Sequence, residues 1–100
     1  MIQADPKELA LARDILRAHL PGAKIWAFGS RTRGGARRGS DLDLAIDAGA
    51  PLSSSAKAQL AVALDEAALP FNVDPVDLHN ISDEFRALID AHKIPFPGFE

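Results

Sequence analysis

Residues 29–44 read Gly-Ser-Arg-Thr-Arg-Gly-Gly-Ala-Arg-Arg-Gly-Ser-Asp-Leu-Asp-Leu, and this stretch organises the fold that the sequence predicts. The apolar run just before it is rich in strand formers, so we predict a strand from Lys24 to Phe28. At its end, acidic and aliphatic side chains alternate from Asp41 to Ile46, which predicts a second strand with one wet and one buried face. The glycines in between are too frequent for a structure that is regular throughout.

Helical and strand patterns continue on both sides of this stretch. Upstream, Asp5 and Glu8 bracket Pro6 as a capping pair, and apolar residues at helical spacing predict a helix from about Pro6 to His19. Downstream we predict a helix, a strand, a helix and a short edge strand, at Ala56–Leu69, Phe71–Leu78, 82–92 and Ile94–Phe96. Pro75 cannot donate to a ladder and therefore restricts the third strand to an edge or a bulge.

The order of these elements predicts an α/β (α+β) fold. The pattern α-β-β-α-β-α, with a short terminal β, suits a small mixed sheet with helices packed on one face. One hundred residues predict a single domain, 1–100, which buries about 65% of the surface exposed by its unfolded chain. Hydrophobic residues at 47% and charged ones at 25% are typical of a globular protein and exclude a disordered chain.

Composition also narrows the location and the partners. The chain has no cysteine, which excludes disulfides and thiolate metal sites and fits a reducing compartment. Charges interrupt the apolar residues at the N-terminus, so we predict a cytoplasmic protein without a signal peptide or membrane span. A net charge of −3 argues against nucleic acid as a direct partner.

The first half of the central stretch predicts an anion site. Gly29 directly follows a strand, where a glycine lets the backbone approach a ligand closely. Ser30 begins a short helix and offers hydroxyl and amide donors to phosphate oxygens. Four of the eleven basic residues follow within eight positions that hold no acid, namely Arg31, Arg33, Arg37 and Arg38.

The second half predicts a cation site. Asp41 and Asp43, two apart on a strand, point to the same side about 7 Å apart. Close carboxylates suit a hard cation such as Mg²⁺ or Mn²⁺, with phosphate completing its ligands. A third carboxylate would help to hold two metals, and the third strand supplies Asp74 and Asp77. These two face opposite sides of a regular strand, and periodicity alone does not choose between them.

Gly-Ser, ten residues and Asp-x-Asp resemble the signature of the DNA polymerase beta nucleotidyltransferase superfamily. From about Leu9 to Phe96 the chain resembles the minimal nucleotidyltransferase branch of that superfamily. The resemblance implies that Gly29 and Ser30 hold a triphosphate, with Arg33 near the phosphates. It also implies three carboxylates as metal ligands, the third being a ligand or general base, at Asp41, Asp43 and Asp74. Pro75 departs from the aliphatic residue expected beside the third.

In this branch a small transferase is typically paired with a helical HEPN-domain toxin. The resemblance implies an antitoxin that transfers AMP from ATP to a tyrosine of that partner in a hetero-oligomer. The chain contains no tyrosine, so such an acceptor must lie on another molecule. The alternatives are an antitoxin that neutralises its partner by contact alone and a transferase acting on a small molecule such as an aminoglycoside, or on an RNA end.

Other polar and aromatic residues have simpler interpretations. We interpret Arg31, Arg37 and Arg38 as a solvated face or a contact for an acidic partner, and Asp77 as a solvent-facing strand residue. Serines 53–55 are predicted to cap the second long helix. Trp26 and Phe28 are predicted to pack in the core, and the three histidines to be exposed or capping bystanders, at His19, His79 and His92.

Overall fold

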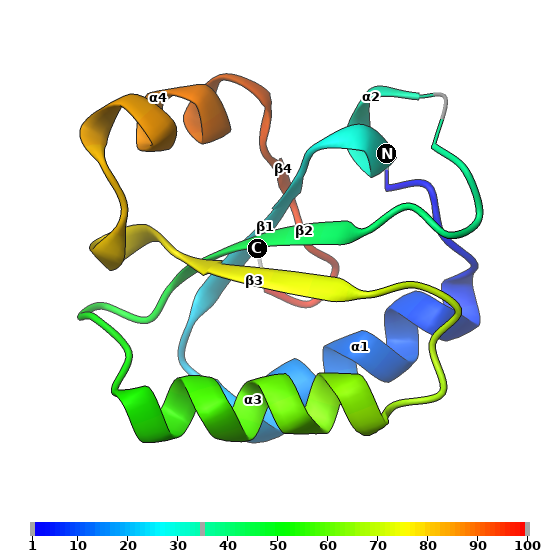
Figure 1. Cartoon of the computed structure of the whole chain (residues 1–100), viewed down its shortest axis with the longest axis horizontal. Coiled ribbons are helices and arrows are strands. Elements are labelled where there is room, and N and C mark those ends of the chain that lie inside the picture. The colour runs from blue at the N-terminus through cyan, green and yellow to red at the C-terminus, as the bar shows by residue number, and fades with distance from the viewer. Residues whose placement is uncertain (1, 35, 100) are drawn as a thin grey trace.

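The computed structural model describes residues 2–34 and 36–99. The elements, in chain order, are α1 Pro6–His19, β1 Lys24–Phe28, α2 Ser30–Arg33, β2 Leu42–Asp47, α3 Ser54–Glu66, β3 Val73–Asp77, the 3-10 turn η1 Leu78–Asn80, α4 Asp83–His92 and β4 Ile94–Pro95 (Figure 1). The predicted α/β class and the order of its elements are confirmed, and α1 and β1 have the predicted bounds. The described residues hold no helix long and apolar enough to span a bilayer.

The four strands form one mixed sheet in the order β3-β2-β1-β4. β1 runs antiparallel to β2, with Phe28 opposite Asp43, and antiparallel to β4. β2 runs parallel to β3, with Asp43 beside Asp74. β3 and β4 lie at the two edges, as Pro75 and the short terminal run predicted.

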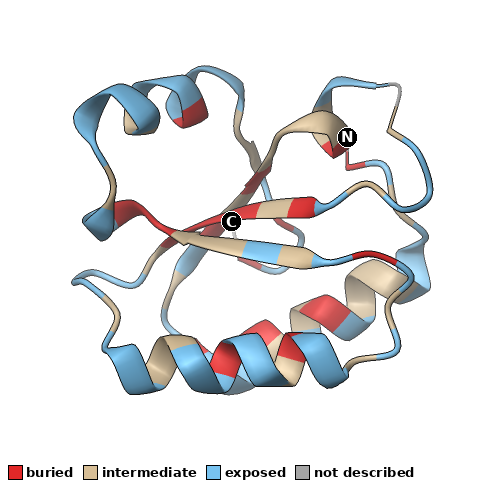
Figure 2. Ribbon diagram, viewed as in Figure 1, coloured by how far each residue is buried: buried red, intermediate tan, exposed pale blue. Residues whose placement is uncertain are grey.

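Helices cover both faces of this sheet unequally. α1 and α3 cover one face, where they meet Leu42, Leu44 and Ile46 in the main core (Figures 1 and 2). α4 packs on the other face, where Ile89 joins Ala45 in a second, smaller cluster. Packing on one face therefore describes α1 and α3 but not α4, because Ala45, on the face of β2 opposite to Leu44, packs against Ile89 of α4.

Local capping decides where the helices begin. The Asp5 carboxylate accepts a hydrogen bond from Lys7 N at 2.8 Å, and Glu8 accepts one from Asp5 N at 3.1 Å. α3 begins at Ser54, two residues before the prediction, because the Ser53 hydroxyl accepts from Ala56 N at 3.0 Å. The predicted caps of α1 and of α3 by the serine run are confirmed, and Ser82 caps α4 by accepting from Phe85 N.

β3 is shorter than predicted and accommodates a proline in its centre. Leu42 N donates to Asn72 O at 2.8 Å, so alternation along the parallel pair points the main chain of Asp74 towards β2. The Pro75 nitrogen then faces the open edge, where no ladder bond is lost. The strand ends at Asp77, because Leu78 begins η1.

Candidate functional site

Strand register brings two of the predicted acids together. Asp43 of β2 and Asp74 of β3 are register partners in a parallel pair, so their side chains share one face of the sheet. That face is opposite to the one occupied by Leu42 and Leu44 in the main core. Asp41 directly precedes β2 and is exposed, so its predicted place inside the strand was wrong by one residue.

Asp43 is the electrostatic centre of this cluster. Burial raises the pKa of the Asp43 carboxyl, and the neighbouring carboxylates Asp74 and Asp41 raise this pKa further. Arg33 opposes them and lowers the pKa of Asp43. Three side chains that the sequence singled out, Asp41, Asp74 and Arg33, therefore lie close enough to Asp43 to act on its carboxylate.

Gly29 lies directly against the Asp43 carboxylate. Its φ of +84° belongs to the region that side chains rarely adopt. A Cβ added at Gly29 would stand 2.3 Å from Asp43 Oδ2, closer than such atoms approach, and 3.2 Å from its Cγ, a tight contact. The sequence predicted that the backbone at Gly29 approaches a ligand, and the group that the structure places against this glycine is the Asp43 carboxylate.

Ser30 begins α2 immediately after this contact, as predicted. Thr32 ties the turn together, because its main-chain N and its hydroxyl donate to Gly29 O at 3.1 and 2.8 Å. Among the described residues the Ser30 hydroxyl has no hydrogen-bond partner, so it is available to a ligand. Arg33, at the end of α2, is exposed.

Arg31 has a different role from the one predicted. Only 4% of it is exposed, and its guanidinium lies over the Phe71 ring at 4.1 Å. It donates to main-chain carbonyls, with Nε to Ser40 O at 2.8 Å, Nη2 to Arg38 O at 2.7 Å and Nη1 to Gln3 O. The interpretation of Arg31 as part of a solvated face was wrong, since it fastens the loop that leads from α2 to the acids. Arg37 and Arg38 are exposed.

Asp77 is likewise a structural residue, not the predicted solvent-facing one. It is 7% exposed and accepts hydrogen bonds from Leu52 N at 2.8 Å and from His79 N at 2.9 Å. Its register partner is Ile46, on the face opposite to Asp43. The geometry therefore places Asp74, and not Asp77, beside Asp43.

His79, which was predicted to be exposed or capping, pairs with an aspartate side chain. Its Nε2 lies 2.6 Å from Asp47 Oδ1, and this contact, together with the Gly49 amide, lowers the pKa of Asp47. Nothing in the sequence signalled the pair, because 32 residues separate its members.

The acidic residues suit a cation whose other ligands come from the phosphates of a substrate. Within 2–34 and 36–99, no three acidic or histidine side chains are grouped closely enough to hold a metal ion by themselves. Asp43 and Asp74 nevertheless supply adjacent hard oxygens whose repulsion raises the pKa of Asp43. Mg²⁺ is commonly bound by one or two carboxylates plus substrate phosphates, and this arrangement suits that mode.

Comparison with known proteins assigns the family. The model of the family described as Polymerase beta, Nucleotidyltransferase matches residues 12–95. A Haemophilus influenzae protein named probable protein adenylyltransferase MntA is 43% identical over 83 residues, which are 83% of this chain and 73% of that protein. The chain therefore belongs to the polymerase beta nucleotidyltransferase family.

Solved structures agree with this assignment. A crystal structure of a toxin–antitoxin with AMP-PNP is 31% identical, with a TM-score of 0.76 over 90% of this chain and 73% of that chain. A toxin–antitoxin MntA–HepT structure is 25% identical, with a TM-score of 0.66 over 94% of this chain and 73% of that chain. The fold and the enzyme class predicted from Gly29 to Leu44 are thus confirmed.

Gly29→Ala should impair both folding and catalysis. Positive φ and the collision with Asp43 should lower the free energy of unfolding by about 1–3 kcal/mol. Displacing the carboxylate should slow nucleotidyl transfer on the order of 10²-fold. Urea denaturation and a transfer assay measure the two effects. Gly22→Ala is the control, since an added Cβ there meets no described atom within 4 Å, and equal behaviour of the two variants would contradict the prediction.

Proposed function

We propose that this chain is a protein adenylyltransferase and antitoxin that transfers AMP from ATP to a tyrosine hydroxyl of a partner HEPN-domain toxin. The observation that carries the proposal is the placement of Asp43 between the Gly29 backbone and Asp74. The similarity of the chain to MntA supports a protein as the acceptor. Its similarity to toxin–antitoxin structures supports a toxin as the partner.

In this proposal the site divides into a phosphate half and a metal half. Gly29, Ser30 and Arg33 hold the triphosphate through main-chain amides, a hydroxyl and a guanidinium. The metal half consists of the three carboxylates, which bind Mg²⁺, or Mn²⁺, together with the nucleotide: Asp41, Asp43 and Asp74. Bound metal supplies neutralisation of the charge on the reacting phosphates.

The proposed step displaces pyrophosphate from the α-phosphorus of ATP. The acceptor oxygen forms a bond to that phosphorus, and the bond from the phosphorus to the bridging oxygen breaks. Asp74 is exposed beside Asp43 and takes the proton of the attacking hydroxyl. Pyrophosphate leaves in line with the attack, which places acceptor and leaving group on opposite sides of the phosphorus.

The acceptor must come from a second molecule. The sequence has no tyrosine, so a tyrosine acceptor is not in this chain. We place the enzyme in the cytoplasm, in a hetero-oligomer with its toxin, where the partner surface completes the site. Neutralisation by contact alone is the competing function, and the placement of Asp43 beside Asp74 and against the Gly29 backbone favours catalysis over it.

Intact mass of the toxin tests the proposal. The chain, ATP, Mg²⁺ and the toxin that co-purifies with it are incubated together, and the toxin is weighed. We expect the toxin to gain the mass of one AMP group, and Asp41→Asn with Asp43→Asn to abolish the gain. No gain, or a gain that survives the double substitution, would overturn the proposal. Full rescue of toxin-inhibited growth by the double variant would favour neutralisation by contact.

A further inference from the structure

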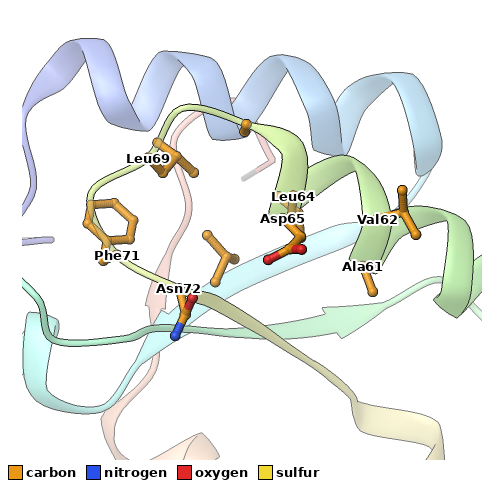
Figure 3. Close-up of a pocket in the computed structure, with 9 residues that line it drawn as sticks. Ala61, Val62, Leu64, Asp65, Leu69, Phe71 and Asn72 are labelled. Carbon is orange, nitrogen blue, oxygen red and sulfur yellow. The ribbon is translucent and has the colours of Figure 1, made fainter.

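A pocket beside the phosphate half is bounded by the end of β1, by α2 and by α4. Its volume is about 290 Å³, and Phe28, Gly29, Arg33, Phe85, Leu88 and His92 line it. It is distinct from the pocket of about 420 Å³ in Figure 3, which is lined by Asp65 of α3 and by Phe71 and Asn72 of the segment that leads into β3. We propose that the β1–α4 pocket binds the base of the nucleotide donor, an inference that rests on the proposed function.

The β1–α4 pocket offers an aromatic surface. Phe28 and Phe85 meet edge to face, with ring centroids 6.2 Å apart and planes at 76°. On α4, Phe85 is 38% exposed and Leu88 is 66% exposed, so both side chains leave apolar surface open beside the pocket. Nucleobases stack on aromatic surfaces of this kind.

The position of the pocket favours the donor base over the acceptor ring. Asp74, Asp43 and Phe28 lie on three successive strands, so Phe28 is two strand spacings, roughly 10 Å, from Asp74. An acceptor hydroxyl that gives its proton to Asp74 approaches from the β3 side. The pocket shares Gly29 and Arg33 with the phosphate half, on the β1 side. The pocket is therefore placed to bind the base of the nucleotide that carries the phosphates, and not the ring of the acceptor.

The pocket should discriminate weakly among purines. Its described lining side chains are apolar or aromatic apart from Arg33 and His92, and none is an amide or a carboxylate. Stacking tolerates either purine, whereas rejecting one requires buried hydrogen-bonding groups that the wrong ring leaves unpaired. ATP and GTP analogues should accordingly bind within about tenfold of each other.

Calorimetry with AMP-PNP and with inorganic tripolyphosphate, each with Mg²⁺, tests the inference. Phe85→Ala should weaken AMP-PNP binding about 5- to 100-fold and leave tripolyphosphate binding unchanged. Phe85→Trp keeps an aromatic surface and should retain AMP-PNP affinity, while Phe85→Leu keeps apolar packing but should lose affinity. Val62→Ala is the control, because Val62 is exposed on α3, away from this pocket.

The outcomes separate this inference from the proposed function. Wild-type AMP-PNP affinity in a folded Phe85→Ala variant would overturn it, as would equal weakening for tripolyphosphate. Unchanged AMP-PNP binding with loss of toxin modification would assign the pocket to the acceptor instead, and so would also overturn it. If Phe85→Ala weakens AMP-PNP binding as expected but the wild type transfers no AMP to the toxin, the base pocket is supported and the toxin is excluded as the acceptor.

Discussion

Asp43→Asn should slow AMP transfer by about 10³-fold, on the order of 4 kcal/mol of transition-state stabilisation, while making the folded chain more stable at neutral pH. The two effects share one cause. Asp43 is partly buried beside Asp74, Asp41 and the Gly29 backbone, so its charge is costly in the free protein. The same charge is needed when phosphates and their metal are bound.

The sign of the pH dependence follows from the raised pKa of Asp43. The unfolded carboxyl loses its proton near the ordinary aspartate pKa, whereas the folded one retains it to higher pH. The folded state therefore binds more protons in this interval, and the free energy of unfolding falls as pH rises through it. Asparagine cannot titrate, so Asp43→Asn should lack this fall and be the more stable protein above the interval.

Thermal unfolding between pH 3.5 and 8, with and without Mg²⁺ and AMP-PNP, measures both consequences. The ligands should raise the melting temperature of the wild type and raise that of the variant much less. Asp47→Asn, on the same strand, is the matched control with the opposite sign. Its pKa is lowered by His79 and the Gly49 amide, so the native carboxylate stabilises the fold above the ordinary pKa, and this is lost as pH falls through the lowered value.

Two results would contradict the account of Asp43. An Asp43→Asn variant less stable than the wild type at pH 7 would mean that the carboxylate is a structural group like Asp47. Equal stabilisation of wild type and variant by Mg²⁺ with AMP-PNP would remove Asp43 from the metal half of the site.

Arg31→Met should lower the free energy of unfolding by about 3 kcal/mol, the largest effect on stability that we expect. Methionine keeps much of the side-chain volume but donates no hydrogen bond. The carbonyls of Gln3, Arg38 and Ser40 would lose their donor, and Phe71 would lose the cation over its ring. The loop from α2 to Asp41 would also lose the hydrogen bonds that hold it in place. Transfer activity should therefore fall in the remaining folded protein.

Urea denaturation with matched baselines measures this loss, and Arg38→Ala is the control. The Arg38 side chain is exposed, and only its main-chain carbonyl accepts from Arg31, so its replacement should change stability by no more than about 0.5 kcal/mol. Similar losses from both substitutions would show that positive charge in the loop matters, and not the burial of Arg31.

The features of this protein that can be predicted from its sequence are local. The helix starts depend on side chains within three residues of the cap, as with Asp5 and Glu8, and strand alternation is visible over two periods. The motif from Gly29 to Asp43 could be recognised for the same reason. Its residues that signal phosphate and metal binding lie within fourteen positions of one another, along the single segment that leads from the end of β1 into β2.

The distant residues that join this motif are set by contacts that form only in the folded chain. Alternation along β3 puts Asp74 and Asp77 on opposite faces, but only the parallel register with β2 sets Asp74 beside Asp43 and Asp77 beside Ile46. Arg31 and its exposed neighbour Arg33 look alike in sequence, and the first is buried because Gln3 and Phe71 close over it. Register and burial depend on contacts between residues that are remote along the chain, and no periodicity within a single segment records them.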